Sequence, residues 1–280
     1  MCGRYAASAN VGELIEEFAV DEDRTNEPTR SLLASPQQPP AGTPDFNMAP
    51  TKQAPVVLTR AVRERPEAGS VRQLRLLTWG LVPGWAKDTK GAVRMINARA
   101  ETIADKPAFA ASVASRRCLV PADGWYEWQL SPTATDAKGR PRKQPFFISR
   151  ADGQGLAMAG IYAFWRDRAV TDAEDPAAWL VSFAVVTSAA EPGLDRIHDR
   201  QPVVLEAADW ERWLDPELDR AEAVADLLAP APPGRFAARP VPSAVGSSRA
   251  NGPGLLAPVP ESDLVGVVDP VTGELIGAGS

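Results

Sequence analysis

Short apolar segments separated by turn-forming residues restrict the fold of this chain more than any other feature of its sequence. Such segments predict β-strands, whereas helices need longer stretches with apolar residues three and four positions apart. Helical spacing is limited to a segment after Asn10, one after Asp105, and two near residues 206–214 and 219–229. Many short strands with few helices predict an α+β fold whose core is a strongly bent or barrel-like mixed β-sheet with peripheral helices. The expected strands cover residues 3–6, 56–58, 74–79, 93–99, 118–120, 124–129, 146–149, 158–164, 180–187 and 202–205.

We expect one domain, spanning residues 1–263. Residues 21–44 are polar and rich in proline, so they are predicted to form a surface loop or insertion. A second loop is expected at about 131–145. Residues 264–280 offer little that could pack and are predicted to be a mobile tail.

The helix ends carry local signals. Ser8 or Asn10 can cap the first helix. Asp105 can cap the second, with Pro107 near its first turn, where the missing N–H of proline is tolerated.

Composition excludes several classes of protein. No apolar run approaches the roughly 18 residues of a membrane helix, and the N-terminus lacks the basic and apolar regions of a secretory signal. The only soft metal ligands are Cys2, Cys118 and His198, whereas structural zinc sites take about four Cys or His ligands. We therefore expect no metal, no cofactor, and a reducing, cytoplasmic location.

The charge distribution allows a nucleic-acid partner despite a net charge of −6. Residues 87–150 contain twelve Lys and Arg against six Asp and Glu, so this block carries +6. Because screening limits charge effects to about 10 Å, a basic block can hold a phosphate backbone locally. A mixed, solvated surface is the alternative explanation.

Cys2 can offer two nucleophiles once the residue before it is removed. Removal of the initiator Met would leave Cys2 with a thiol and a free α-amine on one carbon. An α-amine has a pKa of about 7.7 to 8, so part of it is neutral and nucleophilic near pH 7. Its imine with an aldehyde can be closed by the thiol into a five-membered thiazolidine. The alternative is an incidental small residue at a disordered terminus.

Two titratable residues can supply proton transfer. His198 is the only histidine, so any step that needs a side chain titrating near neutral pH falls to it. The alternative is a surface or capping histidine in a loop. Glu127 lies in GWYEW (124–128), where strand alternation places it with Trp125 and opposite Tyr126 and Trp128. Burial among aromatics would raise its pKa, although pairing with an arginine at a sheet edge is equally compatible with the pattern.

Asn97 and Arg99 lie in MINARAET (95–102) and point the same way in an extended chain. An amide can orient a substrate oxygen and a guanidinium can hold a phosphate, unless Arg99 instead pairs with an acid such as Glu101. Trp79 and Trp85 flank a Pro-Gly turn and can stack on single-stranded bases, although at least one is expected in the core.

The motifs together resemble the SOS response-associated peptidase family, whose members are also called abasic-site processing proteins. The matching stretches run in family order over nearly the whole chain: MCGRYA, NMAPTKQAPVV, WGLVPGWAKD, INARAET, RRCLVPADGWYEW, AGIYAFW, FAVVTSAA, IHDRQPVVL and NGPGLLAPV. The departures are modest. Gln201 stands where Met is more usual, GSSRANGPG is looser than the family's Asn-rich ending, and the 21–44 loop is long.

This resemblance implies a single α+β domain with a basic groove for single-stranded DNA beside the N-terminus. It implies that Cys2 forms a DNA–protein crosslink with abasic sites and that Asn97, Glu127 and His198 complete the active site. The DNA contacts that it implies are Arg4, Trp79, Arg99 and Arg200.

The resemblance also implies a peptidase activity, thought to include the autocatalytic exposure of Cys2. The favoured hypothesis is a monomeric abasic-site sensor that bonds to the lesion as a thiazolidine, associated with the nucleoid when on DNA. The alternatives are a cysteine peptidase with Cys2 and His198 as nucleophile and base, and a noncovalent single-strand binder.

Overall fold

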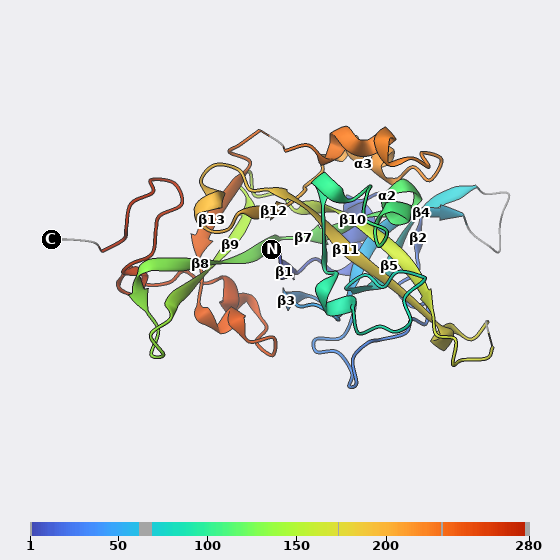
Figure 1. Ribbon diagram of the computed structural model, residues 1–280, viewed down its shortest axis with the longest axis horizontal. Coiled ribbons are helices and arrows are strands. Elements are labelled where there is room, and N and C mark those ends of the chain that lie inside the picture. Colours follow the sequence, from blue (N-terminus) through green and yellow to red (C-terminus); the bar gives the residue numbers. More distant parts are fainter. Residues whose placement is uncertain (1, 62–68, 173, 231, 278–280) are drawn as a thin grey trace.

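A closed barrel forms the centre of the computed structural model, which describes residues 2–61, 69–172, 174–230 and 232–277. Its antiparallel neighbours are β5, β4, β7, β10 and β11 in that order, and a parallel pairing of Phe183 with Trp79 joins β11 back to β5 (Figure 1). The barrel-like α+β core predicted from the sequence is confirmed. The barrel strands are β4 (Gln53–Ala61), β5 (Ser70–Trp79), β7 (Arg117–Ala122), β10 (Leu156–Arg166) and β11 (Trp179–Ala189).

A second sheet lies beside the barrel and contains the N-terminal strand. Its order is β13, β9, β8, β1 and β3, with β1 antiparallel to both of its neighbours. The N-terminal strand β1 therefore lies between β8 and β3 (Figure 1). These strands are β1 (Arg4–Ala7), β3 (Asp45–Met48), β8 (Gly124–Thr135), β9 (Pro141–Arg150) and β13 (Phe236–Pro240).

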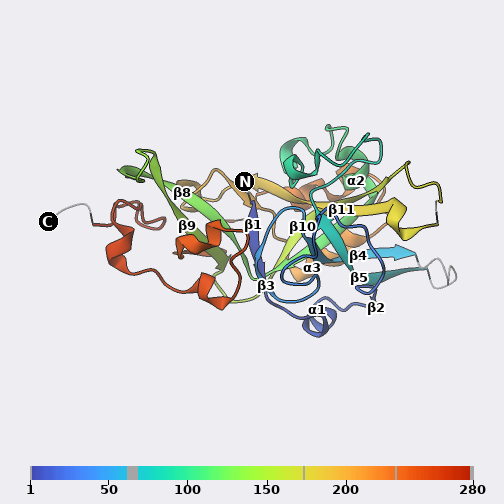
Figure 2. The same cartoon turned by 90° about the horizontal axis from the view of Figure 1, so that it is seen from below.

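Short strands extend the edges of the barrel sheet. β2 (Glu22–Asp23) pairs with β5, while β6 (Asn97–Arg99) and β12 (Arg200–Pro202) both pair with β11. The α-helices are α1 (Val11–Glu17), α2 (Ala110–Ser115) and α3 (Ala207–Leu214). Figure 2 shows α1 below and α2 above the barrel strands.

Strand alternation divides the core into two clusters. One cluster joins barrel residues such as Leu119 and Ile161 to apolar side chains of α1, α2 and α3, so it covers the outside of the barrel. The other contains the alternate residues, including Trp79, Val120 and Val185, and fills the inside together with Cys2. A barrel with so few strands has an interior that side chains fill completely.

The helix ends agree only partly with the sequence signals. Of the two caps proposed for the first helix, Ser8 and Asn10, the structure shows Asn10. It caps α1 and forms a capping box with Glu13. The second helix begins only at Ala110, without a side-chain cap, so the expected cap at Asp105 is wrong. Residues 102–109 form successive turns instead, and Pro107 cannot donate the hydrogen bond that a continuous helix would need.

The loop expected at 131–145 is instead a long β-hairpin made by β8 and β9. Asp136 accepts hydrogen bonds from the N–H groups of Lys138 and Arg140 in its turn, and Gly139 has a φ of +74°. A short Asp- and Gly-containing turn between extended segments is a hairpin signal, so the prediction of a loop overlooked it.

The C-terminal segment has fixed contacts as far as it is described. Leu264 and Val267 are buried in the inner cluster, and Ser131 donates a hydrogen bond to the carbonyl of Gly266. The part of the expected mobile tail at 264–277 is thus packed against β8, and residues 278–280 lie outside the described residues.

Replacing Gly124 by Ala should destabilise the fold. A Cβ at this position would lie 2.4 Å from the backbone oxygen of Ile148 and 2.4 Å from the Phe147 ring. Because a backbone atom cannot move aside cheaply, we expect a loss of about 1–3 kcal/mol in the free energy of unfolding, measured by urea denaturation. Gly254→Ala, where a Cβ meets nothing within 4 Å, is the control. Equal stability of the two variants would contradict close packing at Gly124.

Candidate active site

Cys2 is completely buried and lies two residues before the start of β1. Its carbonyl oxygen accepts a hydrogen bond of 2.8 Å from Asn97 Nδ2. Burial raises the pKa of the Cys2 thiol far above its ordinary value, and the charge of Glu127 adds to this increase. The thiol is therefore protonated at neutral pH and is a poor nucleophile in this environment. Met1, whose removal the crosslink hypothesis requires, lies outside the described residues.

Asn97 reaches Cys2 because β6 is held in register beside β11. Asn97 lies opposite Val185, and Arg99 lies opposite Thr187. Within the described part of the chain, the buried Oδ1 of Asn97 has no hydrogen-bond partner, while its Nδ2 is used by Cys2. A buried acceptor beside the N-terminal residue can receive a hydrogen bond from an amine or a sugar hydroxyl.

Glu127 extends from β8 and is 4% exposed. The alternation predicted for this segment is confirmed, since Trp125 belongs to the inner cluster whereas Tyr126 and Trp128 pack in a separate one. Burial raises the pKa of Glu127, and the nearby His198 opposes this increase. A buried carboxyl group with a raised pKa can exchange protons near neutral pH.

His198 lies in the loop between β11 and β12, immediately after a 3₁₀ turn at Leu194–Arg196. Its Nδ1 accepts a 3.0 Å hydrogen bond from the N–H of Arg200. With Nδ1 as this acceptor, the proton of the neutral imidazole lies on Nε2, which can act as a donor. Asp199 Oδ1 also lies 2.9 Å from the same Nδ1.

The structure thus brings Cys2, Asn97, Glu127 and His198 together. Asn97 bonds to Cys2, the charge of Glu127 acts on the Cys2 thiol, and His198 acts on Glu127. The four come from separate parts of the fold: the N-terminus, β6, β8 and the β11–β12 loop.

The four expected DNA contacts have different surroundings. Trp79 is 0% exposed and donates its indole N–H to the carbonyl of Ile96, so it cannot stack on a base in this structure. Trp85, the other tryptophan beside the Pro-Gly turn, is 66% exposed. Arg99 is also exposed, and Glu101 pairs with Arg200 through bonds of 2.6 and 2.8 Å rather than with Arg99.

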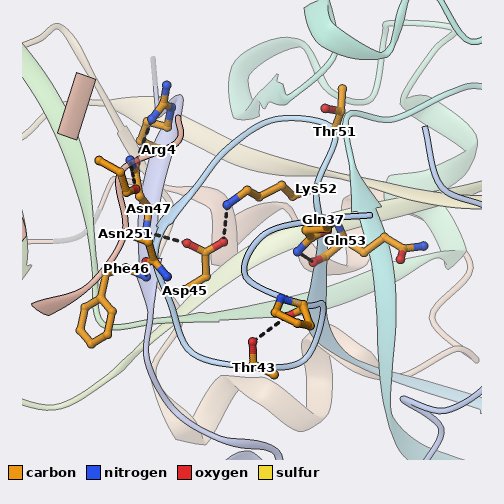
Figure 3. Close-up of polar contacts among 12 residues, drawn as sticks. Arg4, Gln37, Thr43, Asp45, Phe46, Asn47, Thr51, Lys52, Gln53 and Asn251 are labelled. Carbon is orange, nitrogen blue, oxygen red and sulfur yellow. Dashed lines mark hydrogen bonds and ion pairs between the residues drawn. The ribbon is translucent and has the colours of Figure 1, made fainter. Parts of the chain in front are cut away.

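Arg4 forms hydrogen bonds with β3 and with the segment near residue 245. Its Nη1 donates to Asn47 Oδ1 at 2.8 Å and to the carbonyl of Val245 at 3.1 Å (Figure 3). Arg4 thereby ties the N-terminal strand to β3 and to the segment near residue 245.

Sequence reasoning missed Asn47, which organises this region. It is fully buried, and its Nδ2 lies within 3.2 Å of the carbonyls of Val245, Ser247 and Ala250. Beside it, Asp45 accepts both the N–H of Asn47 and the ammonium group of Lys52 (Figure 3). No local pattern reveals Asn47, because its partners are about 200 residues away in sequence.

No helix among the described residues is both long and apolar enough to cross a membrane. No cluster of three or more His, Cys, Asp or Glu side chains in the described part of the chain could hold a metal ion.

The chain is similar to known proteins over most of its length. A family model described as SOS response associated peptidase (SRAP) matches residues 1–248. The chain is 34% identical over 261 residues to the abasic site processing protein YedK of Escherichia coli, covering 92% of this chain and 100% of that protein. It is 32% identical over 289 residues to the abasic site processing protein HMCES of Rattus norvegicus, covering 92% and 76%.

A crystal structure of a Bacteroides thetaiotaomicron protein has a similar fold. Its TM-score is 0.65 at 23% identity, covering 92% of this chain and 100% of that one. The similarity at this level concerns the fold.

The Glu127→Gln variant should be more stable than the wild type at neutral pH. Burial raises the pKa of Glu127, so the native protein keeps a proton that the unfolded chain has lost. Stability therefore falls as the pH rises above the unfolded value of about 4.3, by about 1.4 kcal/mol for each unit of difference between the two pKa values. Urea denaturation at pH 4 to 8 should show a difference that is near zero at pH 4 and grows with pH.

The matched control for the loss of one charge is Glu217→Gln, because Glu217 is exposed. If Glu127→Gln gains no more stability between pH 4 and pH 8 than this control does, Glu127 is not a carboxyl group with a raised pKa.

Proposed function

Because the chain belongs to the SOS response-associated peptidase family, we propose that it captures abasic sites in single-stranded DNA covalently through Cys2. Relatives that it matches over 91–92% of its length are named abasic site processing proteins. The observation that carries the proposal is the Asn97 hydrogen bond to the Cys2 carbonyl, with Glu127 and His198 close by.

The reaction needs no external oxidant or reductant. The α-amine of Cys2, free after loss of Met1, adds to C1′ of the open-chain deoxyribose and forms a carbinolamine. Loss of one water gives an imine. The thiol then adds its sulfur to the imine carbon and its proton reaches the nitrogen, which closes the thiazolidine. One aldehyde and one aminothiol give one ring and one water.

The electrostatics of the site favour this order of steps. Because burial keeps the thiol protonated, the amine attacks first and the thiol closes the ring afterwards. Glu127 accepts the thiol proton and passes it to the ring nitrogen, as its raised pKa suits proton exchange near neutral pH. The same protonated thiol disfavours a peptidase in which Cys2 and His198 form a thiolate–imidazolium pair.

His198 and Asn97 act on the sugar. An abasic deoxyribose is mostly a closed hemiacetal, so its ring oxygen must be protonated before the aldehyde is available. His198 Nε2–H is the donor for this step, since Nδ1 is occupied by the N–H of Arg200. The unpartnered Oδ1 of Asn97 accepts from the Cys2 amine or from a sugar hydroxyl.

DNA contact in this proposal falls to exposed residues. Arg99 follows Asn97 on β6 and is exposed, and Trp85 offers an accessible indole for base stacking. Both lie in or beside the basic block at 87–150. Arg200 and Arg4 mainly position neighbouring segments, because their guanidinium groups are already bound by Glu101 and Asn47.

Cys2→Ala should abolish the covalent adduct and keep noncovalent binding. The variant retains the α-amine and the backbone carbonyl that Asn97 holds, but it lacks the sulfur that closes the ring. The measurement is a denaturing gel and intact-mass analysis after mixing with a uracil-excised oligonucleotide. Cys118→Ala, which removes the other buried cysteine, is the matched control and should still crosslink.

Two results would contradict the proposal. One is a stable adduct in Cys2→Ala, and the other is an adduct on wild-type protein that still carries Met1. Repeated cleavage of added peptide by the wild type would instead support the peptidase alternative, since a crosslinker is consumed in one event.

Arg99→Ala should weaken DNA binding in a salt-dependent way. Each phosphate contact on a single strand contributes about 0.7 to the slope of log affinity against log salt. Loss of one contact should lower that slope by about this amount in fluorescence-anisotropy titrations. Arg168→Ala is the control, because Arg168 is exposed near the start of β11, at the far end from Arg99. Equal slopes in the two variants would remove Arg99 from the phosphate contacts.

A further inference from the structure

Residues 266–276 form a small hairpin beyond the part of the chain that the family model matches. Val268 bridges Leu275, and the N–H groups of Gly266 and Ile276 bond to the carbonyls of Ile276 and Val267. At the tip, Asp269 Oδ1 accepts the N–H groups of Val271 and Thr272. We call these residues the C-terminal hairpin.

The tip of the C-terminal hairpin holds the side chain of Arg196. Arg196 Nη1 donates to the carbonyl of Pro270 at 2.7 Å and to that of Val271 at 3.0 Å. The guanidinium also lies against Gly273, where an added Cβ would be 3.1 Å from Arg196 Cζ. Gly273 has a φ of +79°, so the turn and the space for Arg196 both favour glycine.

Gln129 holds the backbone of Arg196 from the other side. Its Nε2 donates to the carbonyl of Arg196 at 3.1 Å and to that of Val268 at 2.9 Å, while its Oε1 accepts the N–H of Val268 at 2.8 Å. Gln129 is 2% exposed and lies two residues beyond Glu127 on β8. One amide thus connects the strand of Glu127, the C-terminal hairpin and the turn that leads to His198.

His198 lies two residues after Arg196, whose backbone and side chain are both bound. Its N–H and that of Ile197 both bond to the carbonyl of Leu194, in the same 3₁₀ turn as Arg196. Leu194 and Ile197 pack in the inner cluster together with Leu264 and Val267 of the C-terminal segment. Movement of the hairpin would therefore displace the backbone from which the imidazole extends.

We propose that the C-terminal hairpin positions His198, with Arg196 and Gln129 as the positioning residues that transmit its placement. Among the described residues, the side-chain hydrogen bonds that involve Cys2 go to Arg4 and Asn97 and not to the hairpin, so the hairpin acts through the histidine. Its significance for the reaction rests on the proposed function, but its effect on the imidazole does not.

Because His198 is the only histidine, its two imidazole ¹⁵N resonances report its tautomer without overlap. At pH 8 the wild type should show Nδ1 as acceptor and Nε2 as donor, as the Arg200 N–H requires. In Arg196→Ala the two resonances should move toward each other, because a freed loop mixes the tautomers. Asp269→Ala, which loosens the hairpin tip from the opposite side, should produce the same change.

The reaction gives a second measurement. Arg196→Ala should lower the maximal rate of adduct formation about tenfold and leave the half-saturating DNA concentration unchanged. A displacement of the imidazole by about 1 Å is enough to cause a rate loss of this size. Arg196→Lys should recover only part of the rate, because an ammonium lacks the planar fork of a guanidinium. Arg140→Ala is the control, since Arg140 is highly exposed and pairs with Asp136 in the β8–β9 turn.

The possible results separate the two proposals. Unchanged imidazole resonances in folded Arg196→Ala and Asp269→Ala would overturn the positioning role, as would a rate loss that only follows a lower folded fraction. A wild-type protein that forms no adduct would overturn the proposed function, while the resonance shifts would still decide the role of the hairpin.

Discussion

The parallel pairing of β11 with β5 and β6 is the constraint on which the rest of the structure depends. Phe183 opposite Trp79 closes the barrel, and two residues later Val185 lies opposite Asn97, which holds the Cys2 carbonyl. The same strand then continues into the loop of His198. Because one strand closes the barrel and places these groups, the site inherits the rigidity of the closed sheet. Preorganised groups of this kind need no rearrangement during reaction.

Burial of Cys2 gives the site its chemical character. A thiol in this environment stays protonated, and a carboxyl group keeps a proton at a higher pH than it does in water. Under the proposed function, the α-amine that Cys2 gains on loss of Met1 is then the first nucleophile, since an α-amine with its ordinary pKa is partly neutral near pH 7. The separation of the two nucleophiles of one residue therefore follows from desolvation as much as from the identity of Cys2.

The sequence predicted what depends on local periodicity, but one local turn was overlooked and the contacts between distant segments were not predicted. The alternation at Trp125 and Tyr126 was predicted correctly because a strand's faces follow from its period of two. The 131–145 loop was wrong because a turn was overlooked. Trp79 is buried whereas Trp85 is exposed, and the burial of Trp79 depends on barrel closure, which local patterns do not reveal. The four active-site candidates came from the family resemblance, and only the structure shows that they meet.

The distribution of charge indicates how such a protein could recognise damage without strong attraction to DNA. The chain is acidic overall, and two arginines beside the site are already engaged, Arg200 by Glu101 and Arg4 by Asn47 and backbone carbonyls. These two guanidinium groups are therefore not available to phosphates, so intact single strands should bind more weakly than they would with both arginines free. An aldehyde changes this outcome, because ring closure replaces a modest binding free energy by covalent bonds. Under the proposed function, selectivity for the lesion therefore comes from its carbonyl carbon, and the weak electrostatics keep the site available until that carbon arrives.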